Sequence, residues 1–212
     1  MHGTFFDIGL GAGLAAACGL RPFVPVLLAG ALASSRALGV AFVHGHFRFL
    51  ESDWWLLAAA AALVLAYALQ LLLGMAPSLD TSATRSQDVS GPDLLAATIA
   101  GIAYGTGALL FAGTLAAHGD AWWPGLLAGL TVVWVVQRAS APVIVRARTR
   151  LSDRAAREAL TVYLDAAALV LAALVAALHP LGYVAVALLA WFAWRGRARS
   201  DQKYAGLRIL RR

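Results

Sequence analysis

The chain has 212 residues, of which 61% are hydrophobic and only 13% charged, and its formal net charge is +6. A soluble globular domain typically carries about 25% charged residues, so this chain has too little polar surface for a water-soluble fold. The positive charge does not indicate nucleic-acid binding, because the cations lie at the ends of apolar runs instead of on one basic face.

Long apolar runs predict helices that cross a bilayer, because about 20 apolar residues in a helix span the hydrocarbon. The runs bounded by polar or turn residues are 8–34, 54–76, 94–117, 122–145, 158–178 and 181–195. No Lys or Arg precedes the first run, so we interpret it as mature structure and not as a cleaved signal peptide. The sequence predicts an all-α, polytopic membrane helix bundle of about six spans, forming one transmembrane domain over residues 1–212.

The first run contains an arginine and two prolines near its middle, at Arg21, Pro22 and Pro25. Proline removes a helical hydrogen bond, so we expect this helix to kink or break here. A buried arginine in a membrane must face protein or water. Arg21 is therefore a candidate anion or substrate site. The alternative is a structural arginine that caps the carbonyl groups freed at the break.

Four further polar residues interrupt the apolar runs: Gln70, Gln137, Arg138 and Asp165. Their distances from the span ends, at 1.5 Å per residue, place them in one inner-leaflet layer, with Arg21 deeper. Arg138 and Asp165 are the best-matched charge pair, since their spans are consecutive and their depths agree. This layer is predicted either to relay protons or coordinate an ion, or to join helices structurally.

The chain also contains a sequence match between its first and second thirds. Small residues in Ala12–Gly19 match those in Ala100–Gly107, and a Trp-Trp pair precedes Gln70 and Gln137 at nearly equal spacing. This predicts a duplicated two-helix hairpin, over about 8–77 and 94–142, followed by a C-terminal hairpin over 158–195. Copies of two spans keep one orientation, so their symmetry axis would run along the membrane normal. A chance match of small residues is the alternative.

The distribution of cations predicts the orientation of the chain. Thirteen Lys and Arg residues fall in the connections after the second and fourth runs and in the tail 196–212 with its preceding Arg195, against two in the 35–53 segment. Because Lys and Arg in short loops stay on the cytoplasmic side, both termini are predicted to be cytoplasmic.

Other residues give weak signals for chemistry. His44 and His46, with Glu51 and Asp53, could form a metal site, but a His-x-His pair in a loop is a poor predictor of one. No phosphate-binding loop, nucleophile elbow or metalloprotease motif is present, so we expect neither an enzyme nor a cofactor. The expected partners are the lipid bilayer and a second copy or membrane complex, without nucleic acid.

Three short segments carry a family resemblance: Gly19–Pro25, Pro77-x-x-Asp80 and Tyr163-Leu164-Asp165. With them the chain resembles the bacterial multi-pass membrane proteins grouped as domain of unknown function 4126. It departs from that pattern at 73–76, where a more charged segment is expected. The resemblance implies a bacterial cytoplasmic membrane and supplies no reaction or substrate. The broken first helix and the duplication favour transport of a small solute or ion, with a non-transporting scaffold or accessory subunit as the alternative.

Overall fold

The computed structural model describes residues 3–40, 42, 45–75, 91–150 and 154–209, and within these ranges the chain is helical without strands. Its α-helices are α1 (Thr4–Leu20), α2 (Phe23–Ser34), α3 (Asp53–Met75), α4 (Gly91–Ala116), α5 (Trp123–Arg150), α6 (Arg154–Ala177) and α7 (Leu181–Ile209). Two short 3₁₀ helices, η1 (Ala37–Gly39) and η2 (Gly45–Glu51), join α2 to α3. The predicted all-α class is confirmed.

Three of these helices are long and apolar enough to cross a membrane by length and composition: α4 over Ala97–Ala116, α5 over Trp123–Ile144 and α6 over Glu158–Ala177. Shorter apolar stretches form α1, α2 and the first parts of α3 and α7. Large hydrophobic side chains are exposed along several of these helices, including Val64, Val170 and Leu188. Such exposure suits a lipid environment, in which apolar surface needs no cover.

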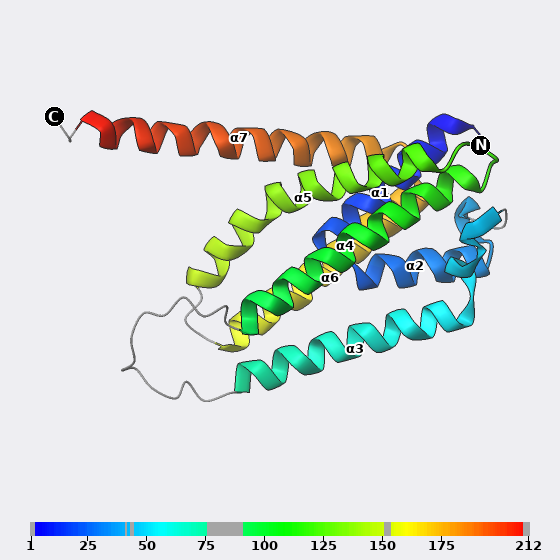
Figure 1. Ribbon diagram of the computed structural model, residues 1–212, viewed down its shortest axis with the longest axis horizontal. Helices are drawn as coiled ribbons and strands as arrows, with labels where there is room; N and C mark the ends of the chain where they lie inside the picture. The colour runs from blue at the N-terminus through cyan, green and yellow to red at the C-terminus, as the bar shows by residue number, and fades with distance from the viewer. Residues whose placement is uncertain (1–2, 41, 43–44, 76–90, 151–153, 210–212) are drawn as a thin grey trace.

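The first apolar run does not form one span. Near its start, the Asp7 carboxylate contacts His118, which follows the C-terminal end of α4. Near its end, Gly30 of α2 lies against Leu50 of η2 and Leu56 in the first turn of α3, and these two elements lie at the same end of the bundle (Figure 1). Helices α1 and α2 therefore form a re-entrant hairpin that enters and leaves at the same end, and the prediction of a single crossing over 8–34 is wrong. The physical reason is that the break at Arg21 turns the chain back instead of only bending it.

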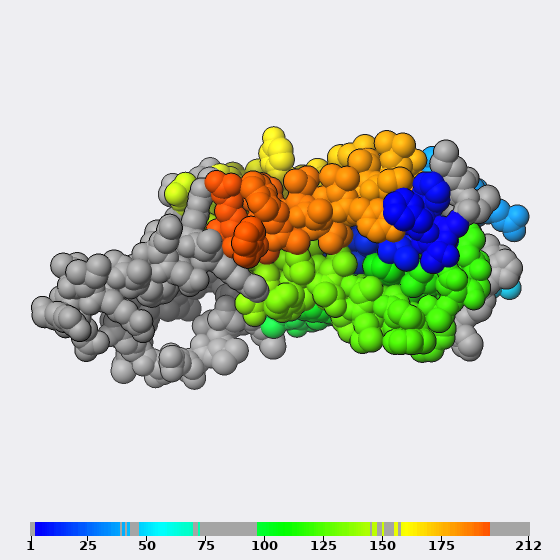
Figure 2. Space-filling view, turned by 90° about the horizontal axis from the view of Figure 1, so that it is seen from above, coloured from blue at the N-terminus to red at the C-terminus, as the bar shows by residue number. Residues whose placement is uncertain are grey.

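The hairpin also decides where the termini lie. The Tyr183 hydroxyl, in the first turn of α7, donates to the carbonyl oxygen of Phe5 at 2.7 Å. The first residues of α1 lie beside the start of α7 (Figure 2), whereas α7 carries the C-terminal end of the described chain to the opposite end of the bundle (Figure 1). The sequence predicted that both termini lie on the same side, which requires residues 8–34 to cross the membrane once. Because they form a hairpin instead, this prediction does not fit the fold.

The predicted duplication does not match the helix directions. Gly11 of α1 faces Thr114 and Phe111 of α4, while Gly107 of α4 faces Ala15, so α1 and α4 run antiparallel. Copies related by an axis along the membrane normal would run parallel. One matched pair has another cause: Gly19 and Gly107 both pack against the valine face of α5, where a side chain would clash with Val133 or Val136.

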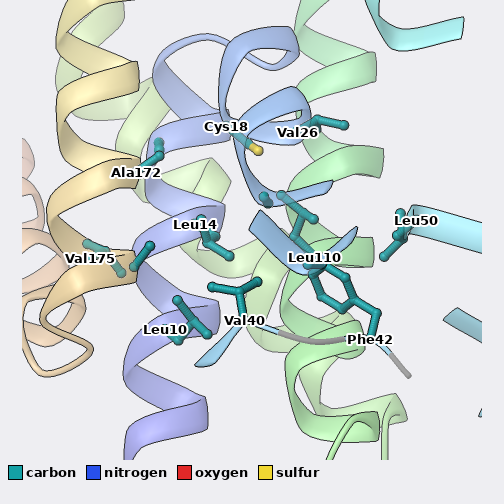
Figure 3. Close-up of a cluster of buried hydrophobic side chains, with 14 of the residues drawn as sticks. Leu10, Leu14, Cys18, Val26, Val40, Phe42, Leu50, Leu110, Ala172 and Val175 are labelled. Carbon is teal, nitrogen blue, oxygen red and sulfur yellow. The ribbon is translucent and has the colours of Figure 1, made fainter. Parts of the chain in front are cut away.

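Close helix contacts bury α1 at the centre of the bundle. Its residues Leu10, Leu14 and Cys18 are almost fully buried and meet side chains of α2, α4, α6 and the 40–50 segment (Figure 3). A Cβ on Gly182 of α7 would overlap the carbonyl oxygen of Gly9, so the two backbones touch there. Small residues permit this approach, which fixes the depth and direction of α1.

Candidate functional site

Arg21 lies at the tip of the re-entrant hairpin. Its backbone is extended (φ −152°, ψ 122°), and its N–H donates to the carbonyl oxygen of Ala17 at 3.0 Å, which ends α1. Pro22, directly before α2, already has a helical conformation, and Pro25 lies in the first turn of α2, where the missing N–H costs little. The predicted break at this segment is confirmed.

The guanidinium of Arg21 pairs with a carboxylate on α6. Its Nε lies 3.3 Å from Oδ1 of Asp165, and both side chains are only 13% exposed. Asp165 is eleven residues after the start of α6, which places it about 17 Å along the helix at 1.5 Å per residue. The ion pair therefore lies near the middle of α6, far from either end of the bundle.

A tyrosine from a third element completes the cluster. The Tyr67 hydroxyl, on α3, donates to Oδ2 of Asp165. Helix α3 packs along α2 and η2 at one side of the bundle (Figure 1). The bond from Tyr67 thus joins α3 to α6 at the level of the hairpin tip. Arg21, Asp165 and Tyr67 form what we call the central triad.

A small pocket lies beside the central triad. It is partly open and has room for about one water molecule. Its apolar walls come from α2, α3 and α4. The lining residues are Phe23, Leu63, Ala66 and Ile99, together with the three members of the triad. A ligand held here would touch a guanidinium, a carboxylate and a phenol within an apolar enclosure.

One guanidinium nitrogen of Arg21 is not engaged. Nη2 is buried and has no hydrogen-bond partner in the described part of the chain. Guanidinium carries five N–H donors in a planar fork, and a buried donor left unsatisfied costs about 1–3 kcal/mol. The site thus has unused capacity for an acceptor.

The other predicted site residues are not in the triad. Arg138 is exposed on α5, with its guanidinium carbon 5.0 Å from the centre of the Trp134 ring, so the prediction that it pairs with Asp165 is wrong. The reason is the face of α5 that is buried, which carries Val133, Val136 and Ala139 and leaves Arg138 outside. Gln137 is half-buried on α5.

The remaining candidate residues, in α3 and in the segment before it, are only partly covered by the described structure. The backbone of Gln70 lies in α3, but its side chain lies outside the described residues, as does His44. Glu51 accepts a hydrogen bond from the backbone N–H of Phe42. Within the described ranges, no group of three or more His, Cys, Asp or Glu residues is placed to hold a metal ion.

A second polar cluster lies at the end of the bundle where α1 begins, and sequence reasoning missed it. Asp7 is only 6% exposed, and its Oδ1 lies 3.2 Å from Nδ1 of His118. His179 lies nearby, where partial burial lowers its pKa and the charge of Asp7 partly opposes that shift. The sequence signal that could have indicated this cluster is Asp7 itself, an acidic residue in the first turn of an otherwise apolar helix.

Comparison with known proteins gives no relative. No protein-family model, curated protein or solved structure matches the chain.

Proposed function

We propose that this chain is an integral protein of a bacterial cytoplasmic membrane that transports a small solute or ion through the central triad. The observation that carries this proposal is the position of Arg21: it lies at a helix break deep in the bundle, paired with Asp165 and beside a pocket. Solute carriers often place their sites at broken helices near the middle of the bilayer.

The buried charges of the triad favour a ligand-binding role for these residues over a role in helix packing alone. Removing two charges from water costs several kcal/mol for each ion, so a buried ion pair is a weak way to stabilise a fold. A pair kept only for packing would have its hydrogen bonds satisfied. Here Nη2 of Arg21 has no partner among the described residues, which supports a site that receives a ligand.

The orientation that we propose has five crossing helices, α3 to α7, and a hairpin that re-enters from outside. The arginine-rich end, where α5 ends and α6 begins, would face the cytoplasm, because cations in short loops remain there. The start of α1 would then face outward and the end of α7 inward. The resemblance of Gly19–Pro25 to a bacterial membrane family favours the bacterial cytoplasmic membrane.

The test is flux through vesicles that contain the purified protein. Potassium, sodium, chloride, nitrate and sulfate gradients would be applied in turn. We expect flux of at least one ion, and a loss of at least tenfold in Arg21→Lys, since a point charge does not replace the planar fork. Arg138→Lys is the matched control and should retain the flux. A well-folded wild-type protein that moves none of these ions would instead favour a scaffold or accessory subunit.

A further inference from the structure

We propose that the central triad binds a small planar oxyanion of the nitrate type, and that Asp165 takes up one proton as the anion binds to Arg21. The anion replaces the Asp165 carboxylate as the counter-ion of the guanidinium, so the chain acts as an anion–proton symporter. This inference rests on the proposed transport function and specifies its substrate class and coupling ion.

The geometry of Arg21 provides the anion site. The ion pair uses Nε, at 3.3 Å from Oδ1 of Asp165, while Nη2 is buried and without a partner in the described chain. A planar oxyanion can accept two parallel N–H bonds from a guanidinium fork, a geometry that a spherical ion cannot match.

The start of α2 adds further donors at the same place. No side chain caps its first turn, and Phe23, its first residue, lines the pocket. The first N–H groups of a helix have no partner within the helix and carry partial positive charge. In this turn only Phe23 and Val24 carry an N–H group, since Pro22 and Pro25 have none, and the partial positive charge of the helix start favours an anion on this side of the pocket.

Charge balance requires the proton. Arg21 and Asp165 are neutral as a pair, and an added anion alone would leave one net negative charge in a buried site, at a cost of several kcal/mol. The titratable groups that the described structure places against Asp165 are Arg21 from the hairpin tip and Tyr67 from α3. The phenol already donates to Asp165 and Arg21 remains charged, so the proton that restores neutrality goes to the Asp165 carboxylate.

Protonation also releases the anion site. A neutral carboxyl group has lost its electrostatic attraction to Arg21, but its carbonyl oxygen can still accept the Tyr67 hydroxyl. Because the pocket has room for only about one water molecule, binding of the anion requires the neutral carboxyl group to turn away from Arg21 while it keeps its contact with Tyr67. A cation would meet the guanidinium at this site and be repelled.

The binding test uses the purified full-length protein and sodium nitrate. Nitrate should raise the thermal unfolding temperature, with chloride and sulfate much weaker. If one proton accompanies each nitrate, the dissociation constant should rise about tenfold for each unit of pH over the range in which Asp165 is ionised in the free protein. Arg21→Lys should weaken nitrate binding at least tenfold. Stabilisation by nitrate that is independent of pH would overturn the coupling.

The transport test measures proton entry with a pH dye inside vesicles of phosphatidylethanolamine and phosphatidylglycerol. An inward nitrate gradient should acidify the interior, with one proton for each nitrate and no dependence on membrane potential. Nitric acid is a strong acid, so simple permeation of the neutral acid does not mimic this result. Asp165→Asn resembles the protonated state and should carry nitrate without protons, driven by membrane potential. Tyr67→Phe should reduce coupled uptake. Tyr163→Phe, at an exposed tyrosine on α6, is its control and should leave uptake unchanged.

The outcomes separate this inference from the proposed function. Flux of potassium or sodium that depends on Arg21, without nitrate flux, would keep the transport function and overturn the anion–proton mechanism. Nitrate binding that depends on pH and Arg21, without flux of any ion, would support the oxyanion site and overturn transport. If Asp165→Asn does not fold, the pH dependence of nitrate binding and the proton-to-nitrate ratio of the wild type still decide the coupling.

Discussion

Removal of one charge of the ion pair should destabilise the protein far more than removal of both. Breaking a buried pair by substituting one partner costs about 3–5 kcal/mol, because the remaining charge stays buried without a counter-ion. Arg21 and Asp165 are each 13% exposed, so a little water reaches them and the lower value applies. Arg21→Met and Asp165→Leu should each lower the free energy of unfolding by about 3 kcal/mol. In a chain of 212 residues this lowers the midpoint by about 6–12 °C, at about 2–4 °C per kcal/mol.

The double variant with Arg21→Met and Asp165→Leu removes both charges and should recover to within about 1 kcal/mol of the wild type. Thermal unfolding in detergent measures all three variants, and Arg138→Met, at an exposed position, should change stability by no more than about 0.5 kcal/mol. The double variant should nevertheless have no transport activity. Additive losses in the double variant would refute the pairing, and full activity in it would refute the assigned role of the site.

Three further predictions follow from packing, topology and titration. Gly182→Ala should lower the unfolding temperature because the new Cβ would overlap the Gly9 backbone, whereas Gly101→Ala, with open space around it in α4, should be neutral or stabilising by about 1 kcal/mol. In a cysteine-free background, an impermeant thiol reagent should label Thr4→Cys from outside and Arg150→Cys only from inside; labelling of both on one side would contradict the hairpin. Burial lowers the pKa of His179, so the folded state disfavours its charged form and stability should fall as pH drops below about 6.5; His179→Gln should flatten that dependence.

The sequence by itself determined the class of the protein and several local features. Apolar runs of 20 residues leave few alternatives to helices in a membrane, and the long apolar segments of α4, α5 and α6 lie within the predicted runs. The break at Arg21 was also predictable, since proline at 22 and 25 removes backbone donors whatever surrounds them. Asp165 was recognised as a candidate for the same kind of reason, as a charge within an apolar helix.

Only the tertiary structure decided which residues meet. A break after Leu20 is compatible with a kinked span and with a hairpin, and the choice depends on close contacts of α1, such as Gly9 with the α7 backbone. Arg138 was predicted as the partner of Asp165 because the two residues lie at similar depths in consecutive spans. The depth of a residue, however, does not tell which face of its helix is buried. Because Val133 and Val136 pack inward, Arg138 points away, and the hairpin instead brings Arg21, 144 positions away in sequence, to within 3.3 Å of Asp165. Such a contact depends on how helices far apart in the chain pack together, which local sequence patterns do not encode.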